Sequence, residues 1–157
     1  TDRRAGKRTL AVRLGRERAR GLYAALVDRA ALEKWLPPQG MSGRIEWWEP
    51  RAGGGFRMVL TYLDATGKPG KSSDATDVVE VAFAELTPPR RLVQRAGFAA
   101  EDPAFAGTMT MTWDIVGEGD GSEVTVTATD VPPGIDPGDH EDGIGSSLDN
   151  LAAYLRN

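Results

Sequence analysis

The sequence contains no cysteine, and this absence removes several kinds of chemistry at once. Without thiols the chain forms no disulfide, has no thiolate nucleophile and offers no cysteine ligand to zinc or to an iron–sulfur cluster. A single histidine, His140, is the only side chain that ordinarily exchanges protons near neutral pH. One histidine cannot build a metal site without carboxylate help, and the acidic residues are not spaced to provide it. We therefore expect no metal, no cofactor and no conventional set of catalytic residues.

Long apolar runs are also missing. No segment is long enough to cross a bilayer, and the first residues lack the basic-then-apolar order of a secretory signal. A hydrophobic content of 40% and a charged content of 27% are typical of a globular chain, and 157 residues suffice for a substantial core. We expect one cytoplasmic domain over residues 1–157, with residues 1–8 as a flexible basic tail.

The charge is unevenly distributed along the chain. Residues 1–95 contain 18 of the 19 lysines and arginines and 11 acidic residues, a local charge of +7. Residues 96–157 contain one arginine and 12 acidic residues, a local charge of −11. The net charge of −4 argues against nucleic acid as the main partner. We expect the chain to bind neither nucleic acid nor a membrane.

Strict alternation of apolar and polar residues predicts a β-sheet. Each predicted strand places its apolar residues on one face, which is typical of antiparallel sheets with one buried side. The short links between strands are rich in glycine, proline and aspartate, which favours antiparallel pairing. The predicted strands are residues 9–14, 43–49, 56–62, 79–84, 91–98, 108–115 and 123–127.

One long helix is predicted at the end of the chain, over residues 137–157. Its apolar residues recur at steps of four, three and four and so form a single stripe. Asp136 is a favourable cap for its first turn, and Pro137 suits the first helical position. Gly143 and Gly145 inside the helix lower its stability, and we interpret them as leaving open space beside the helix. Two short helices are predicted earlier, over residues 17–27 and, after an Asp28 cap, up to Trp35.

A sheet with one apolar face and a helix with one apolar stripe are natural partners, so we expect the functional site between them. Methionine and aromatic side chains on the predicted inner face suit a pocket for a flexible apolar ligand, although for each one alone an ordinary core position is the simpler interpretation. Gln94 shares the inward parity of its strand and would place an amide there. His140 lies four residues before Ile144, on the face of the helix stripe. The candidates from this pattern are Met58, Tyr62, Phe83, Gln94, Met109, Met111, Trp113, His140, Ile144 and Leu148.

Two adjacent tryptophans, Trp47 and Trp48, occupy one predicted strand. Successive residues on a strand point to opposite faces, so one of the two must point outward. An exposed tryptophan would indicate a surface for a partner.

Five short motifs, in order along the chain, resemble the bacterial branch of the heat-shock-protein-90 ATPase activator homologue family, within the START-like SRPBCC superfamily. The motifs are Trp35-Leu36-Pro37-Pro38, Gly54-Gly55-Phe56-Arg57, the run 83–89 followed by Arg91-Leu92-Val93, the run 107–112, and His140-x-x-Gly143 followed by Ser147-Leu148-x-Asn150-Leu151. The resemblance covers nearly the whole chain from about Thr9.

This resemblance implies an α+β helix-grip fold. In that fold a curved antiparallel sheet wraps around a long C-terminal helix, and two short helices follow the first strand. It also implies a cavity that binds hydrophobic small molecules in many relatives, with Trp35, Tyr62, Met109 and His140 as lining or rim residues. The family has no universal catalytic residues to transfer, and its name does not carry a chaperone role to most bacterial members.

Three functions follow as hypotheses. The leading one is the binding of a hydrophobic or amphipathic small molecule, without catalysis, between the sheet and the last helix. The second is an enzyme of the polyketide cyclase or aromatase type, with His140, Tyr62 or Gln94 as acid, base or orienting group. The third is a co-chaperone or stress-response adaptor that acts on a heat-shock-protein ATPase through its surface. A homodimer and a chaperone partner are left open, and the sequence does not identify the ligand.

Overall fold

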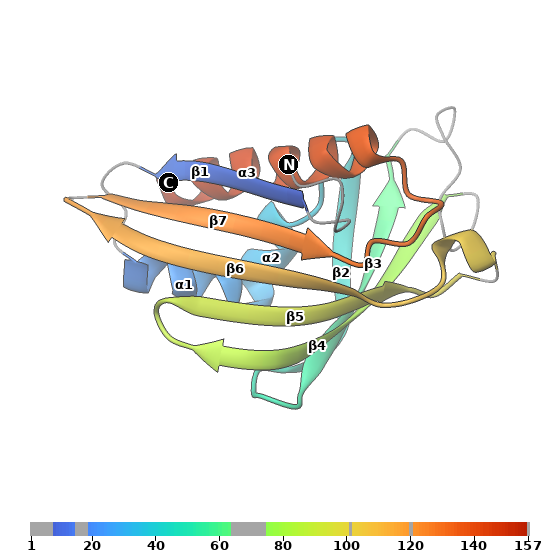
Figure 1. Cartoon of the computed structure of the whole chain (residues 1–157), viewed down its shortest axis with the longest axis horizontal. Coiled ribbons are helices and arrows are strands. Elements are labelled where there is room, and N and C mark those ends of the chain that lie inside the picture. The colour runs from blue at the N-terminus through green and yellow to red at the C-terminus, as the bar shows by residue number, and fades with distance from the viewer. Residues whose placement is uncertain (1–7, 15–18, 64–74, 101, 120, 157) are drawn as a thin grey trace.

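The computed structural model describes residues 8–14, 19–63, 75–100, 102–119 and 121–156. Within these residues the chain forms a curved seven-stranded antiparallel sheet with three α-helices on one face (Figure 1). The predicted helix-grip α+β fold is therefore confirmed. The predicted tail lies outside the described residues, except for Arg8 at the start of the first strand. The elements are β1 (Arg8–Leu14), α1 (Ala19–Leu26), α2 (Arg29–Trp35), β2 (Met41–Glu49), β3 (Gly55–Tyr62), β4 (Thr76–Thr87), β5 (Arg91–Phe98), the 3₁₀ turn η1 (Pro103–Phe105), β6 (Met109–Glu118), β7 (Gly121–Thr129) and α3 (Pro137–Arg156).

The strand order explains the position of the two short helices. The order β1-β7-β6-β5-β4-β3-β2 places β1 at one edge of the sheet and β2 at the other. The segment containing α1 and α2 therefore carries the chain across the full width of the sheet. Asp28 caps α2, as predicted, because its carboxylate accepts a hydrogen bond from the Ala31 amide at 2.9 Å. The Trp35 indole donates to the Ala25 carbonyl at 2.9 Å and joins the two helices.

Alternation along the strands produces the core. The largest buried side chains come from the inner face of the sheet and from all three helices. Trp35 of α2 packs edge-to-face against Trp113 of β6, with ring centroids 5.7 Å apart. Each such residue contributes about 1.5–3 kcal/mol when it is fully buried. The inner face of the sheet is therefore the side on which the fold is held together.

Several strands are longer than predicted. β4 covers Thr76–Thr87 rather than 79–84, and β2 begins at Met41 rather than Gly43. The link between the predicted strands 108–115 and 123–127 is shorter than predicted, because β6 continues to Glu118 and β7 begins at Gly121. Glycine retains both of its backbone hydrogen-bonding groups, so ladder pairing continues where side-chain alternation ends.

A β-bulge decides which of the adjacent tryptophans faces outward. The register of β2 against β3 shifts between Ile45 and Trp47, so that Glu46 and Trp47 both lie on the outer face. Trp47 is 42% exposed, whereas Trp48 packs inward against Phe56 at a ring distance of 5.5 Å. Without the bulge, Trp47 would share the inward parity of Ile45. The bulge thus decides that Trp47, rather than Trp48, is the tryptophan on the outer face.

The long helix α3 begins as predicted and is fixed near its middle. The Asp136 carboxylate accepts a hydrogen bond from the Asp139 amide at 2.9 Å. Side chains of α3 also bond to the segment that follows α2: Ser147 donates to the Leu36 carbonyl at 2.6 Å, and Asn150 donates to the Pro37 carbonyl at 2.9 Å. These two bonds hold the second half of α3 against α2. None of the helices in the described part of the chain has the length and apolar character needed to cross a membrane.

Candidate ligand-binding site

The inner face of the sheet contains a buried polar pair in an otherwise apolar surface. Gln94 on β5 is 7% exposed, and its side-chain oxygen accepts a hydrogen bond from the Trp113 indole at 2.9 Å. Gln94 therefore lies inward, at the place that its parity predicts. The Gln94 side-chain oxygen thus satisfies the Trp113 indole N–H, which is buried and would otherwise be unpaired.

One end of the inner face is only partly covered. Along β3, Phe56 and Met58 are buried, whereas Leu60 and Tyr62 are partly exposed. On the neighbouring strands, Val79 of β4 and Phe98 at the end of β5 are also partly exposed, whereas Asp77 of β4, the partner of Leu60, is buried. Val79 is the direct partner of both Met58 and Phe98 in the sheet. These partly exposed side chains therefore form a continuous apolar surface, which we call the open end: Leu60, Tyr62, Val79 and Phe98.

The first half of α3 lies near this open end. The Gln39 amide donates to the Ser146 hydroxyl at 2.8 Å, and Met41 pairs with Tyr62 in the sheet, so the middle of the helix is close to the end of β3. Along the apolar stripe of α3, Ile144 is partly buried and Leu148 is completely buried. The helix is therefore tightly packed over its second half and more loosely packed over its first half.

Gly143 lies in the loosely packed half of α3. A Cβ atom added there would meet no described residue within 4 Å. The glycine is therefore not required by a close approach of another element. The helix has room at this position, in the half that lies near the open end.

The predicted candidates divide into two groups. Tyr62, His140 and Ile144 are partly exposed, Tyr62 at the open end itself and the other two on the first half of α3. The remaining eight lie in the covered part of the core: Trp35, Met58, Phe83, Gln94, Met109, Met111, Trp113 and Leu148. The structure therefore places all eleven on the inner side of the sheet or on the elements that cover it. Whether they contact a ligand remains a prediction.

Two further polar groups belong to the inner side and were not predicted from the sequence. Asp77 on β4 is 3% exposed, next to Leu60 in the sheet register. The sequence signal for its inward position was the alternation on the strand, because Asp77 shares the parity of Val79 and Val81. Tyr23 on α1 is also buried, and its hydroxyl has no hydrogen-bond partner among the described residues. Burial raises the pKa of the Tyr23 hydroxyl above its ordinary value of 10.0, so the group is a neutral donor at physiological pH.

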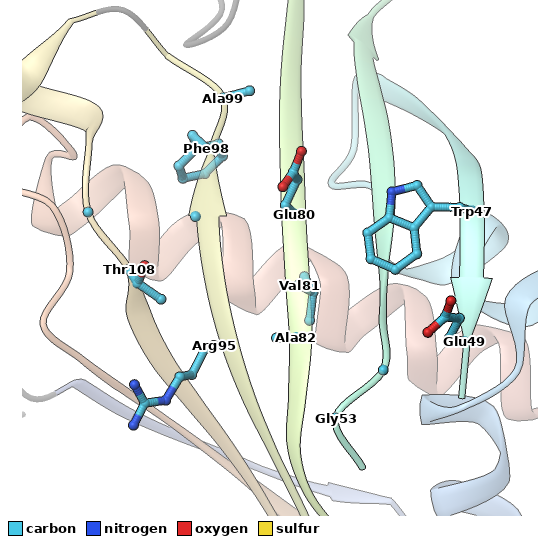
Figure 2. Close-up of a pocket in the computed structure, with 13 residues that line it drawn as sticks. Trp47, Glu49, Gly53, Glu80, Val81, Ala82, Arg95, Phe98, Ala99 and Thr108 are labelled. Atoms are coloured by element: carbon cyan, nitrogen blue, oxygen red, sulfur yellow. The ribbon is translucent and has the colours of Figure 1, made fainter. Parts of the chain in front are cut away.

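The outer face of the sheet carries a groove of about 820 Å³ (Figure 2). Trp47 stands at one side of the groove, and Arg95 and Thr108 stand at the other, with Glu80 between them. Glycine and alanine residues form much of its floor, among them Gly54, Gly97 and Ala82. None of the eleven predicted residues lines this groove.

A metal centre has no support in the described part of the chain. No group of three or more histidine, cysteine, aspartate or glutamate side chains is placed there to hold an ion. The chemistry available at the open end is therefore that of apolar surface and a few hydroxyl, imidazole and carboxylate groups.

Comparison with known proteins identifies the family. The model of the family described as "Activator of Hsp90 ATPase homolog 1-like protein" matches residues 18–156, so the chain belongs to this family. This match confirms the resemblance that the sequence motifs indicate, within the SRPBCC superfamily.

Solved structures agree on the fold. Protein CV1439 from Chromobacterium violaceum is 24% identical, with a TM-score of 0.84 over 97% of this chain and 98% of that one. A protein from Arthrobacter aurescens is 18% identical, with a TM-score of 0.83 over 99% and 89% of the two chains. DynU16, a protein in the dynemicin biosynthetic locus, is 17% identical, with a TM-score of 0.66 over 97% of this chain and 48% of that one. No curated protein matches the sequence significantly.

Proposed function

We propose that this protein binds an apolar or amphipathic small molecule between the sheet and α3, reached through the open end. The observation that supports this proposal most directly is the decrease of burial along β3, from Phe56 and Met58 to Leu60 and Tyr62. Apolar side chains at Leu60, Tyr62, Val79 and Phe98 stay partly exposed beside a helix half that is loosely packed. Each square ångström of this surface that a ligand covers is worth about 25 cal/mol.

The residues behind the open end suit an adaptable lining. Met58 lies next to Leu60 on the inward face of β3, and Met109 and Met111 lie on the inward face of β6. Methionine has no branching and changes rotamer at low cost, so a core containing it adjusts to a guest more easily than one of β-branched residues.

Catalysis of the cyclase type is the second candidate. Tyr62 and His140 are both on the partly exposed side of the inner region, where a substrate would meet a hydroxyl and an imidazole. The structural relative DynU16 comes from a biosynthetic locus, which is a precedent for this fold in such a setting. Turnover separates the two candidates: an enzyme converts the bound compound and loses that activity when His140 is replaced by alanine, whereas a binding protein releases the compound unchanged. The co-chaperone hypothesis stays a prediction, as no feature described here tests it.

The experiment combines extraction with a fluorescent probe. Organic extracts of the purified protein are analysed by mass spectrometry, and the affinity for 1-aminoanthracene, an uncharged apolar fluorophore, is measured by titration. We expect an extracted compound or saturable binding of the probe. Ile144→Trp enlarges the side chain beside the open end and should weaken probe binding by about tenfold or more.

The matched control is Asp149→Trp, because Asp149 is exposed on the same helix. It adds an indole of the same size outside the proposed site and should leave probe affinity unchanged. Equal affinities of the two variants, with both correctly folded, would contradict the proposal.

A further inference from the structure

The groove on the outer face is a candidate site of its own, because the sheet separates it from the inner region. In Figure 2, α3 runs behind the strands, while Trp47, Glu80 and Arg95 stand on the viewer's side. A volume of about 820 Å³ falls within the usual range of small-molecule pockets. The groove therefore has the size for a ligand, and its lining includes Val81 of the core and Phe98 of the open end in addition to outer-face residues.

Ion pairs between described residues engage the carboxylates that line the groove. Arg57 forms ion pairs with Glu46 and Glu80, both at 3.0 Å, and Arg51 pairs with Glu49 at 3.1 Å. The carboxylates that line the groove are thus already neutralised by neighbouring arginines.

Arg91 and Arg95 lie on the same strand and the same face, but they differ in their partners. Arg91 pairs with Glu85 at 3.5 Å and with Asp114 at 3.3 Å. Arg95 makes no hydrogen bond or ion pair with any residue that the structure describes, and its neighbours across the sheet are Ala82 and Thr110. A guanidinium without a carboxylate presents a fork of donors that fits a carboxylate with two parallel bonds.

The rest of the groove suits a flat apolar group. Trp47, 42% exposed, offers an indole at the opposite side. β2 and β5 are three strand spacings apart, about 14 Å. The side chains of Trp47 and Arg95 make the distance between the indole and the guanidinium different from this backbone spacing. Two strands, β3 and β4, lie between β2 and β5. Ala82 on β4 has only a methyl group, so a planar body can approach the sheet closely at this position. We propose that this groove binds a small aromatic carboxylate, with its carboxylate on Arg95 and its ring on the side of Trp47.

The test uses two probes of the same shape and different charge. 2-Naphthoate and the uncharged 2-naphthalenemethanol are titrated into ¹⁵N-labelled full-length protein, and the indole signal of Trp47 and the amide of Gly97 are followed. We expect both signals to shift with naphthoate. R95Q should weaken naphthoate binding about tenfold and change binding of the alcohol less than about twofold. R91Q is the matched control, because it removes an arginine of the same strand and face outside the groove, and it should leave naphthoate affinity within about twofold.

Three results would overturn the proposal. The first is an equal loss of naphthoate affinity in R95Q and R91Q. The second is a shift of the buried Trp35 and Trp113 signals in place of Trp47, which would assign the probe to the inner region. The third is the absence of saturation up to about 10 mM. The inner and outer sites lie on opposite faces, so either proposal can fail without the other.

Discussion

The two faces of the same sheet differ in nearly every physical property. The inner face is apolar, is covered by three helices, and places its few polar groups in single buried positions such as Gln94 and Asp77. The outer face carries a network of ion pairs and an open groove. Neighbouring residues of one strand belong to these two environments, as Gln94 and Arg95 do. The comparison teaches that one strand of this protein can contribute to two separate binding surfaces, and it predicts that adjacent substitutions differ strongly in effect.

The largest difference is expected on β6. Trp113→Ala removes a buried indole from the inner face and should lower the free energy of unfolding by about 3–5 kcal/mol. Thr112→Ala, on the same strand and the outer face, should cost less than about 1 kcal/mol. Urea unfolding followed by circular dichroism measures both. Similar losses in the two variants would break the comparison between the faces.

A smaller difference is expected between Gln94 and Arg95. Gln94→Leu leaves the Trp113 indole N–H buried without its acceptor, at an expected cost of about 1–3 kcal/mol. Arg95→Gln changes an exposed side chain without an ion-pair partner and should alter stability by less than about 0.5 kcal/mol. Thermal and urea unfolding of both variants provide the measurement. A stable Gln94→Leu protein would show that the polar pair is not needed to satisfy the core.

The two serine hydrogen bonds of α3 are each expected to contribute on the order of 1 kcal/mol to the free energy of unfolding. Ser147→Ala removes a hydrogen bond from a buried hydroxyl to the Leu36 carbonyl and should cost about 1 kcal/mol or slightly more. Ser146→Ala removes the more exposed bond to the Gln39 amide and should cost about half as much. Hydrogen exchange of the α3 amides reports the local effect. Equal protection in both variants would contradict the view that the second half of the helix is fixed more firmly than the first.

The smallest effect at neutral pH is expected for Tyr23→Phe. Its hydroxyl has no partner among the described residues, so its removal should change stability by less than about 1 kcal/mol at pH 7. The effect grows with pH. Because burial raises the pKa of Tyr23 in the folded state, the unfolded chain ionises first, and the wild-type protein loses stability as pH rises above 10.0. The free energies of unfolding of wild type and Tyr23→Phe, measured between pH 8 and pH 11, should therefore diverge above pH 10.0, with Tyr23→Phe the more stable. A difference that stays constant over this range would contradict the assignment.

The elements with strong periodicity were predictable from the sequence, and the reasons are local. The four-three-four spacing in α3 and the Asp136 and Asp28 caps depend only on neighbouring residues, and the structure confirms them. The ends of β4 and β6 were not predictable, because backbone pairing there does not require alternating side chains. The bulge in β2 was likewise hidden, since register depends on the partner strand.

The candidate site was predictable in position but not in detail. Parity placed Met58, Phe83 and Gln94 inward, because side-chain direction in a strand alternates whatever the strand pairs with. Parity alone does not reveal which of these residues are completely covered, because the cover comes from helices in other parts of the sequence. The outer groove was missed for the same reason. It depends on four strands lying side by side and on the ion pairs between them, neither of which is visible along a single segment.

The most direct test of the central claim asks which tryptophans sense an apolar guest. In a ¹⁵N-labelled sample titrated with 1-aminoanthracene, the indole signals of Trp35 and Trp113 report the inner region, and that of Trp47 reports the outer face. Binding between the sheet and α3 predicts saturable shifts of Trp35 and Trp113 with little change at Trp47. Saturable shifts confined to Trp47, or none at any of the three, would contradict it.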